Sequence, residues 1–424
     1  MKGATEDLIA RRERVLGVGA PLFYEEPLHI VRGEGVYLFD ADGRRYLDIY
    51  NNVPCVGHAN PHVVEAMRQQ AGTLNVHSRY LHEGVVDYAE RLVARHDPSL
   101  ERIVFTCTGT EANEVAIAMA RLATGGRGII CTDRAYHGNS ALVNKLTWAG
   151  GRSDPEIRPV RFPQRYRPIE AGLSEDELCD RYLADVQAAI ESFDAAGVPL
   201  AAMLVCSLCA NEGLPEIPQG YMARAARMVR EAGGLFIADE VQAGFCRSGR
   251  WWGYEATGFV PDIATLGKPM GNGLPVAGAV ARGELVDAFR KGSGYFNTFA
   301  ASPLQAAAAA AVLDVLEAEK LEARALEVGS YLRERLRGIE CEAIGDVRGH
   351  GLFIGVEWVS DREAKTADPK GAIRVVNRLK EKGVLTSNAG ALFNVVKLRP
   401  PLVFERQHAD EFLNAFEETV RELA

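Results

Sequence analysis

GLFIADEVQAGF, residues 234–245, decides the fold of this chain. The apolar run 235–238 has the composition of a buried strand, and it ends in two adjacent carboxylates, Asp239 and Glu240. A buried acid needs a positive or donating group to hold. Ligands of an open parallel sheet bind beyond the carboxyl ends of its strands. We therefore expect Asp239 to face a ligand.

Short apolar runs alternate with helical stretches from about residue 60 onward, which is the pattern of a parallel sheet covered by helices on both faces. Residues 28–50 alternate and turn like an antiparallel meander. A long helix is expected from Ser302-Pro303, a second helical stretch to about Arg337, and a final amphipathic helix over residues 409–423. We predict an α/β fold. Residues 61–310 form its large domain, and residues 1–60 and 311–424 join in a smaller α+β domain.

The composition is that of a large globular enzyme. The 424 residues are 47% hydrophobic and 25% charged, with a net charge of -9. An acidic balance argues against a nucleic-acid or anionic-membrane surface. No window approaches the roughly 20 apolar residues of a membrane span, and the charged N-terminus lacks the apolar core of a signal peptide. We expect a cytoplasmic protein without nucleic-acid or membrane partners.

Eight cysteines scattered through the chain do not form a disulfide framework. Cys206 and Cys209 have C-x-x-C spacing, but a zinc site needs four ligands and no second pair is nearby. A redox dithiol would begin a helix, whereas this pair follows a strand-like run. We expect buried thiols and no metal site.

A lysine follows the next strand-like run. Residues 263–266 lead into Gly267 and Lys268, so the amine and the Asp239 carboxylate would open onto the same crevice. Two interpretations compete: a salt bridge between strand ends, or a pyridoxal phosphate held between the two groups. In the second, Lys268 forms the Schiff base and Asp239 keeps the ring nitrogen protonated.

A phosphate site is the third requirement. Residues 103–113, IVFTCTGTEAN, have the pattern of a strand, a small-residue turn and a helix start. Free N–H groups at a helix N-terminus bind phosphate, Gly109 permits close approach, and threonine hydroxyls add donors. Tyr136 also follows a strand and supplies an aromatic ring suited to lie flat on a cofactor.

Residues 234–278, GLFIADEVQAGFCRSGRWWGYEATGFVPDIATLGKPMGNGLPVAG, resemble the signature of class III aminotransferases, which are fold-type-I pyridoxal-phosphate enzymes. TGTEANE, DRAYHG, FNTFAASPLQAA and LRPPLVF resemble the same family, and the likeness covers nearly the whole chain. NNVPCVGH, NVHSRYLH and YFNTF further resemble the branch of alanine–glyoxylate aminotransferase 2-like proteins and ethanolamine-phosphate phospho-lyases. The resemblance implies a fold-type-I transferase with a mostly parallel, seven-stranded sheet in its large domain.

The resemblance also implies a role for each matching residue. Lys268 would be the catalytic lysine, bonded to the cofactor and then moving the substrate proton, and Asp239 would hold the ring nitrogen. A homodimer would be the minimum active unit, with or without pairing into tetramers, because Thr298 would reach the phosphate of the partner subunit's cofactor. The other cofactor contacts implied are Thr108, Gly109 and Thr110 at the phosphate, Tyr136 and His137 on the ring, Val241 beneath it and Gln242 at its phenolic oxygen.

The substrate residues depart from the family pattern. Many relatives carry an R-x-x-P-P string and a paired Glu; here Lys397 and Cys206 stand at those places. Lysine is a point charge without the planar fork that grips a carboxylate. Arg399 is a second candidate, since strand alternation puts it on the same face as Lys397; surface or interface salt bridges are the alternative for both. Asn52 and Arg79 lie in segments that line the substrate entrance in relatives.

The resemblance implies an aminotransferase that moves an amino group from an amine or ω-amino acid to a keto acid such as pyruvate. The alternative on this fold is a phospho-lyase that eliminates phosphate and ammonia from a phosphorylated amino alcohol, with Lys397 and Arg79 serving a second phosphate. Racemases and decarboxylases also occur on it. A nucleotide-binding or regulatory protein is the alternative from another class, and it would form no covalent lysine adduct.

Overall fold

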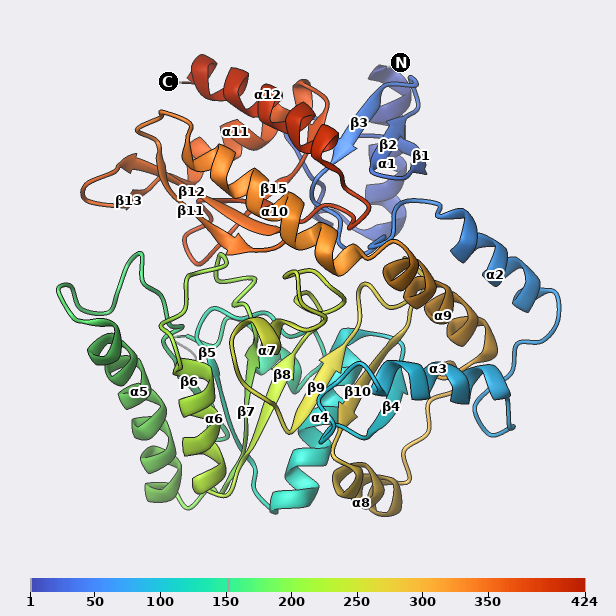
Figure 1. The fold of residues 1–424 in the computed structure, drawn as a ribbon, viewed down its shortest axis with the longest axis vertical. Helices are drawn as coiled ribbons and strands as arrows, with labels where there is room; N and C mark the ends of the chain where they lie inside the picture. Colours follow the sequence, from blue (N-terminus) through green and yellow to red (C-terminus); the bar gives the residue numbers. More distant parts are fainter. Residues whose placement is uncertain (1, 151–152, 424) are drawn as a thin grey trace.

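A computed structural model describes residues 2–150 and 153–423 of the chain. Its largest element is a seven-stranded sheet in the order β4-β10-β9-β8-β7-β5-β6 (Figure 1). β10 runs antiparallel to both of its neighbours, and the other adjacent pairs are parallel. The strands are β4 (Arg102–Thr106), β5 (Gly128–Thr132), β6 (Ile157–Val160), β7 (Leu200–Cys206), β8 (Leu235–Asp239), β9 (Ile263–Leu266) and β10 (Ala277–Ala281). The predicted α/β fold with a mostly parallel sheet is confirmed.

Helices cover both faces of this sheet, because side chains alternate along each strand. Leu204 and Ile237 pack on the side of α4 (Gly109–Thr124) and α8 (Gly283–Ser293). Phe236 belongs instead to the cluster that holds the apolar faces of α5 (Glu175–Ala195) and α6 (Tyr221–Glu231). The alternation therefore sends Asp239 toward the α4 side, which Ile237 also faces, and Glu240 toward the opposite side.

The two chain ends build the second layer of structure above the strand ends (Figure 1). The predicted meander is β1 (Ile30–Glu34), β2 (Tyr37–Asp40) and β3 (Arg45–Asp48), and β14 (Val384–Leu385) extends it by pairing with β3. A five-stranded sheet joins β11 (Ile344–His350), β12 (Phe353–Asp361), β13 (Thr366–Ala367), β15 (Ser387–Ala389) and β16 (Val395–Leu398). The β3–β14 pair supports the proposed union of residues 1–60 with 311–424, and the domain boundaries stay a prediction.

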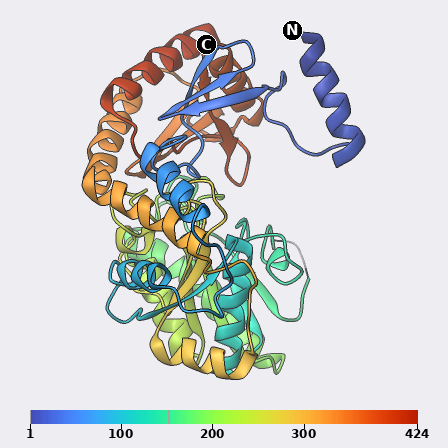
Figure 2. The same cartoon turned by 90° about the vertical axis from the view of Figure 1, so that its right-hand side faces the viewer.

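Helices link and cover these sheets. The predicted helix after Ser302 is α9 (Pro303–Ala318), which Ser302 caps in a reciprocal capping box with Gln305. The remaining helical elements are α1 (Lys2–Leu16), α2 (Pro61–Ala71), α3 (Glu83–Val93), η1 (Val143–Lys145), α7 (Gly253–Ala256), α10 (Leu321–Arg337), α11 (Pro369–Glu381) and α12 (Arg406–Leu423). Figure 2 shows α1 standing off from the side of the molecule.

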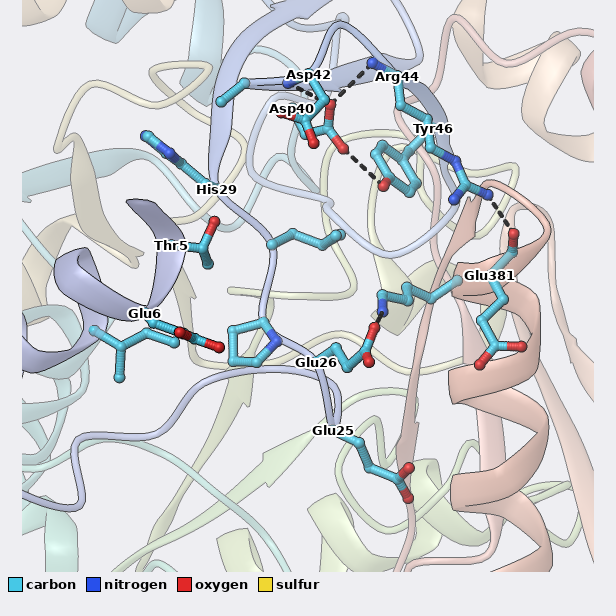
Figure 3. A pocket seen from close by; sticks show the side chains of 15 residues that line it. Thr5, Glu6, Glu25, Glu26, His29, Asp40, Asp42, Arg44, Tyr46 and Glu381 are labelled. Atoms are coloured by element: carbon cyan, nitrogen blue, oxygen red, sulfur yellow. Dashed lines mark hydrogen bonds and ion pairs between the residues drawn. The ribbon is translucent and has the colours of Figure 1, made fainter. Parts of the chain in front are cut away.

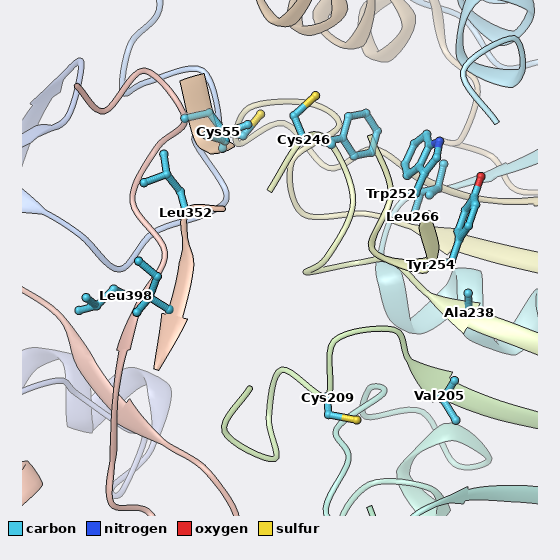
Figure 4. Packing of buried hydrophobic residues seen from close by; sticks show 14 of the residues in the cluster. Cys55, Val205, Cys209, Ala238, Cys246, Trp252, Tyr254, Leu266, Leu352 and Leu398 are labelled. Carbon is cyan, nitrogen blue, oxygen red and sulfur yellow. The ribbon is translucent and has the colours of Figure 1, made fainter. Parts of the chain in front are cut away.

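One apolar cluster runs from the strand ends of the large sheet into the upper layer. Leu352 and Leu398 of the upper layer belong to the same buried cluster as Trp252, Leu266 and Ala238, and Figure 4 shows these residues on the two sides of the cluster. The interior of the two layers is therefore continuous, and groups at the strand ends lie between them. No helix in the described part of the chain is long and apolar enough to cross a membrane. The cytoplasmic location stays a prediction.

Candidate active site

Asp239 ends β8 with its buried carboxylate bound on both oxygens. Oδ2 accepts a hydrogen bond from Asn113 Nδ2 at 3.1 Å and lies 2.7 Å from His137 Nδ1, while Oδ1 accepts one from the Val241 amide at 3.0 Å. Asn113 is held in turn by its contacts with the His137 carbonyl and the Thr265 hydroxyl. The carboxylate is thus fixed in one orientation at the strand end.

Glu240, the adjacent acid, faces the other way. Its carboxylate accepts hydrogen bonds from the Ser207 hydroxyl and from the amides of Gly253 at 2.7 Å and Tyr254 at 2.9 Å. These amides begin the short helix α7, so Glu240 holds that turn against the sheet. Its role is structural, and only Asp239 of the pair is turned toward the pocket.

A pH-dependent stability follows from the position of Glu240. Burial raises the pKa of Glu240 from 4.5 to about 7. The pKa of Glu240 in the folded protein lies above its value in the unfolded chain. The contribution of Glu240 to the stability of the fold is therefore fully present below pH about 4.5 and is lost as the pH rises through about 7. We expect the Tm of the wild type to fall relative to that of Glu240→Gln across this window, by calorimetry at a series of pH values. Parallel Tm curves for the two proteins would refute this.

Lys268 follows β9, the neighbour of β8, and lines the same pocket as Asp239. Burial lowers the pKa of the Lys268 amine; the Arg399 charge lowers it further, and Asp239 opposes the shift. A lowered pKa makes the neutral amine more available, as Schiff-base chemistry requires. The competing interpretation, a direct salt bridge with Asp239, does not apply, since no ion pair joins them in the described chain.

The predicted phosphate cradle lies at the start of α4. Thr108 is the N-cap residue. Its side chain accepts a hydrogen bond from the Glu111 amide, and the Glu111 carboxylate accepts one from the Thr108 amide. Gly109 and Thr110 are the first helical residues, where N–H groups point out of the helix. A Cβ added to Gly109 would lie 2.8 Å from the Val241 side chain, so only glycine fits between the helix start and the strand end.

Most of the predicted cofactor residues meet in one pocket. Thr108 caps the helix instead of lining the pocket, and Thr298 lies exposed outside it. Sequence reasoning did not assign Gly138 or Asn211, which also line it; both follow strand ends, but neither residue type signals a ligand by itself. The pocket is lined by Gly109, Thr110, Tyr136, His137, Gly138, Cys206, Asn211, Asp239, Val241, Gln242 and Lys268.

Two basic side chains, Lys397 and Arg399, converge on Gln242, and burial lowers the pKa of the Lys397 amine well below its usual value. Lys397 Nζ donates to the Ala210 carbonyl at 2.6 Å and lies 3.3 Å from Gln242 Oε1; Arg399 Nη1 donates to the same oxygen at 2.5 Å. The predicted shared face is therefore confirmed. Both side chains are buried, and neither forms an ion pair with a described carboxylate, so the surface half of the salt-bridge alternative is wrong and the interface half stays a prediction.

None of the four substrate candidates lines the pocket itself; Lys397 and Arg399 contact Gln242 of its lining, and Asn52 and Arg79 do not. Asn52 is buried, and its Nδ2 makes no hydrogen bond within the described chain. Arg79 is exposed, with its guanidinium 3.9 Å from the centre of the Phe296 ring. Cys206 and Cys209 are both buried, free thiols, and burial raises the pKa of each. Cys206 lines the pocket as a neutral thiol.

A second hollow lies between α1 and the N-terminal meander (Figure 3). Carboxylates outnumber cations along its wall, which Glu6, Glu26, Asp40 and Asp42 help to form. An acidic wall repels a phosphate, and the hollow holds none of the predicted site residues. The pocket at the strand ends is the candidate active site.

The described residues of this pocket fit pyridoxal phosphate. Lys268 supplies an amine of lowered pKa, Asp239 a fixed carboxylate, and the start of α4 a phosphate cradle in which Gly109 leaves room for the Val241 side chain. When bound, this group supplies an aldehyde for an amine and a ring that accepts electrons. Within the described residues, no three His, Cys, Asp or Glu side chains gather as a metal site.

The sequence profile of the class-III aminotransferases matches residues 23–420, and the chain belongs to that family. It is therefore an enzyme of the pyridoxal-phosphate-dependent transaminase class. It is 40% identical to an alanine–glyoxylate aminotransferase 2-like protein of Drosophila melanogaster over 97% of this chain and 86% of that one. It is 33% identical to ethanolamine-phosphate phospho-lyase homolog 1 of Caenorhabditis elegans, over 98% and 93%.

One solved structure that is similar to this chain is a phospholyase from Arthrobacter in complex with phosphoethanolamine. It superposes with a TM-score of 0.95 at 43% identity, covering 98% of this chain and all of that one. The family and the suspected branch are therefore both confirmed, and the reaction within the branch is left to be proposed.

Gly109 provides a direct test of the cradle. Gly109→Ala would push a methyl group into the Val241 side chain, and overpacking of this kind costs about 1–3 kcal/mol. We expect cofactor affinity to fall by about 5- to 150-fold, the range to which this cost converts, measured from the cofactor absorbance retained during dialysis. Gly72→Ala, at an exposed helix end where the added Cβ makes ordinary contacts, is the control. Equal retention by both variants would contradict the assignment.

Proposed function

We propose that this enzyme transfers an amino group from an amine or ω-amino acid to a keto acid such as pyruvate. The observation that supports it is the convergence of Lys397 and Arg399 on Gln242 without a carboxylate partner. Buried Lys and Arg side chains need an anion or neutral hydrogen-bond acceptors around them. An ω-amino acid and a keto acid each carry a carboxylate, which Arg399 would hold while the amine reaches Lys268; the bound carboxylate would also favour the protonated form of Lys397.

The chain's own groups divide the work. Lys268, with its lowered pKa, takes a proton from the substrate carbon that bears the amino group. It later gives a proton back to complete the transfer of that group. Asp239 provides a fixed negative charge, oriented before substrate arrives by Asn113, His137 and the Val241 amide. Such preorganised charge stabilises a transition state without reorganisation. Tyr136 and Val241 would hold the cofactor ring from its two faces.

The active unit is proposed to be a homodimer. Thr298 lies outside the pocket of its own chain, in a stretch where Phe296 and Phe299 are exposed. Exposed aromatic side chains of this kind commonly mark an interface. In a dimer, Thr298 would reach the cofactor phosphate of the partner subunit.

A second candidate is elimination of phosphate from a phosphorylated amino alcohol. Lys397 and Cys206 replace the Arg and Glu of the family pattern, and lysine binds phosphate as a point charge but grips a carboxylate less specifically. The phosphoethanolamine complex of the Arthrobacter relative supports this candidate as well. Arg79, which stacks on Phe296, is exposed and lies outside the pocket lining.

One panel of reactions separates the candidates. The purified holoenzyme is given amines and ω-amino acids with pyruvate, and separately phosphoethanolamine without a keto acid. Alanine formed from pyruvate supports transfer, and inorganic phosphate with an aldehyde supports elimination. Absence of both products would reject both proposals and leave racemisation or decarboxylation.

A further inference from the structure

Arg247 lies in the loop that follows β8, and its side chain reaches the upper layer. Its Nη1 donates to the Leu352 carbonyl at 3.2 Å and to the Pro400 carbonyl, and its own carbonyl accepts from the Leu352 amide at 3.1 Å. The turn before Leu352 comes close: a Cβ on Gly351 would lie 2.7 Å from the Arg247 carbonyl oxygen. Arg247 thus joins the loop after β8 to two segments of the small domain.

This guanidinium is buried without an acid. Arg247 is 1% exposed, and its Nε and Nη2 make no hydrogen bond in the described chain. It forms no ion pair with any described carboxylate, unlike Arg348, which binds Glu357 at 2.5 Å. Burying an unpaired cation is costly, and the cost is offset only by suitable partners. A simple link between domains would not require a charge here.

Arg247 holds the peptide that carries Arg399. The Pro400 carbonyl, which Arg247 binds, comes directly after Arg399, and the Arg399 amide donates to the Ile49 carbonyl at 2.8 Å. The Arg399 guanidinium lies 4.2 Å from the centre of the Tyr50 ring and bonds Gln242 at the pocket. The backbone on both sides of Arg399 is therefore fixed, which fixes the direction of its side chain.

Hydrogen-bond donors without a partner in the described chain lie on Arg399 and on the segment beside it. Arg399 is 8% exposed, and its Nε, like Asn52 Nδ2, makes no hydrogen bond in the described residues. Residues 49–55 and 399–402 run side by side, since the Leu402 amide also donates to the Cys55 carbonyl at 2.6 Å. Asp48, the nearby acid, is already bound by His58 at 2.7 Å and by Asn51 at 3.0 Å. The Asp48 charge offsets part of the positive charge of the two arginines, but Asp48 forms no ion pair with either of them in the described chain, so both guanidinium groups keep donors for a ligand.

We propose that Arg247 is a positioning and specificity residue for the anionic end of the substrate. It orients Arg399 through the Pro400 carbonyl and adds a second buried positive charge behind it. The pair selects amines that carry a carboxylate or a phosphate distant from the amino group over amines with a neutral tail. The inference rests on the proposed function, because it assumes that the pocket processes amines.

Arg247→Met and Arg247→Lys test this role. The measured quantity is the ratio of kcat/KM for an anionic amine, β-alanine or phosphoethanolamine, to kcat/KM for n-butylamine. We expect Arg247→Met to lower this ratio about tenfold, mainly through KM, and Arg247→Lys to lower it less, because lysine keeps the charge but loses the planar fork. The two anionic substrates show whether a carboxylate or a phosphate depends more on Arg247.

Arg333→Met is the matched control. Arg333 also binds a backbone carbonyl of the small domain, that of Gly349, and its Nε is likewise unpartnered, but it lies outside the contacts of Arg399. We expect the ratio to stay at the wild-type value in this variant. An unchanged ratio in folded Arg247 variants would overturn the proposal. Loss of folding in both Arg247 variants with Arg333→Met folded would also overturn it, since Arg247 would then be a structural link.

A binding measurement separates failure of this inference from failure of the proposed function. Inorganic phosphate is added to the holoenzyme, and Tm is compared with chloride at equal ionic strength. We expect phosphate to raise the Tm of the wild type and to raise that of Arg247→Lys less. If no amine reacts but this difference is found, the anion site stands and the proposed reaction is wrong. Equal phosphate shifts in the two proteins would refute the role of Arg247.

Discussion

Lys268→Ala is expected to abolish amino transfer, with turnover lower by at least about 10⁴-fold. Lys268 is the pocket's lysine, and its amine has a lowered pKa. In the proposed mechanism, removal takes away both the group that bonds the cofactor and the group that moves the substrate proton. Single-turnover kinetics with the best donor of the panel measure the loss, which should appear in the chemical step.

Lys291→Ala is the control, because Lys291 is exposed at the end of α8. It should turn over at the wild-type rate. A Lys268→Ala enzyme that keeps more than about a hundredth of the wild-type rate would show that another base moves the proton.

Asp239→Asn is expected to lower turnover by about 10²- to 10³-fold with the protein still folded. The amide has the size of the carboxylate and keeps contacts with the Val241 amide, but it lacks the charge needed to hold a protonated ring nitrogen. His137 Nδ1, 2.7 Å from the carboxylate, would also lose an acid partner. Steady-state kinetics and the cofactor absorption spectrum measure the effect.

Glu240→Gln is the matched control for this charge. Glu240 is the neighbouring acid in the chain, and its bonds go to Ser207, Gly253 and Tyr254 on the opposite side of the strand. Neutralising it should change the pH dependence of stability and leave turnover within about threefold of the wild type. Equal losses in the two variants would mean that charge at the end of β8 acts through folding and not through the pocket.

The strand ends explain why so much of the site could be predicted from the sequence. Asp239 and Lys268 each follow a short apolar run, and parallel strands deliver such residues to one edge of the sheet. Strand–glycine–helix turns are common, so Gly109 could be predicted only together with Asp239 and Lys268. Strand alternation also placed Lys397 and Arg399 on one face.

Other contacts lack a local signal. Asn113, which orients Asp239, lies in the interior of α4, where an Asn has no pattern to mark it. The buried position of Arg247 depends on carbonyls of Leu352 and Pro400, which are more than a hundred residues away in the chain. The helix α1 was not expected, because its charged sequence has no apolar stripe facing a core. α12 begins three residues before the predicted Ala409, since helix ends are weakly encoded.

The central claim is that one lysine and one carboxylate of this pocket hold the same cofactor, and the lysine is directly testable. The holoenzyme is reduced with borohydride, digested, and its pyridoxyl-modified peptide is identified by mass spectrometry. The pocket predicts one modified residue, Lys268. Lys397 is the informative rival, because burial also lowers the pKa of its amine well below the usual value and it lies next to Gln242. A pyridoxyl group on Lys397, or on no lysine, would contradict the account.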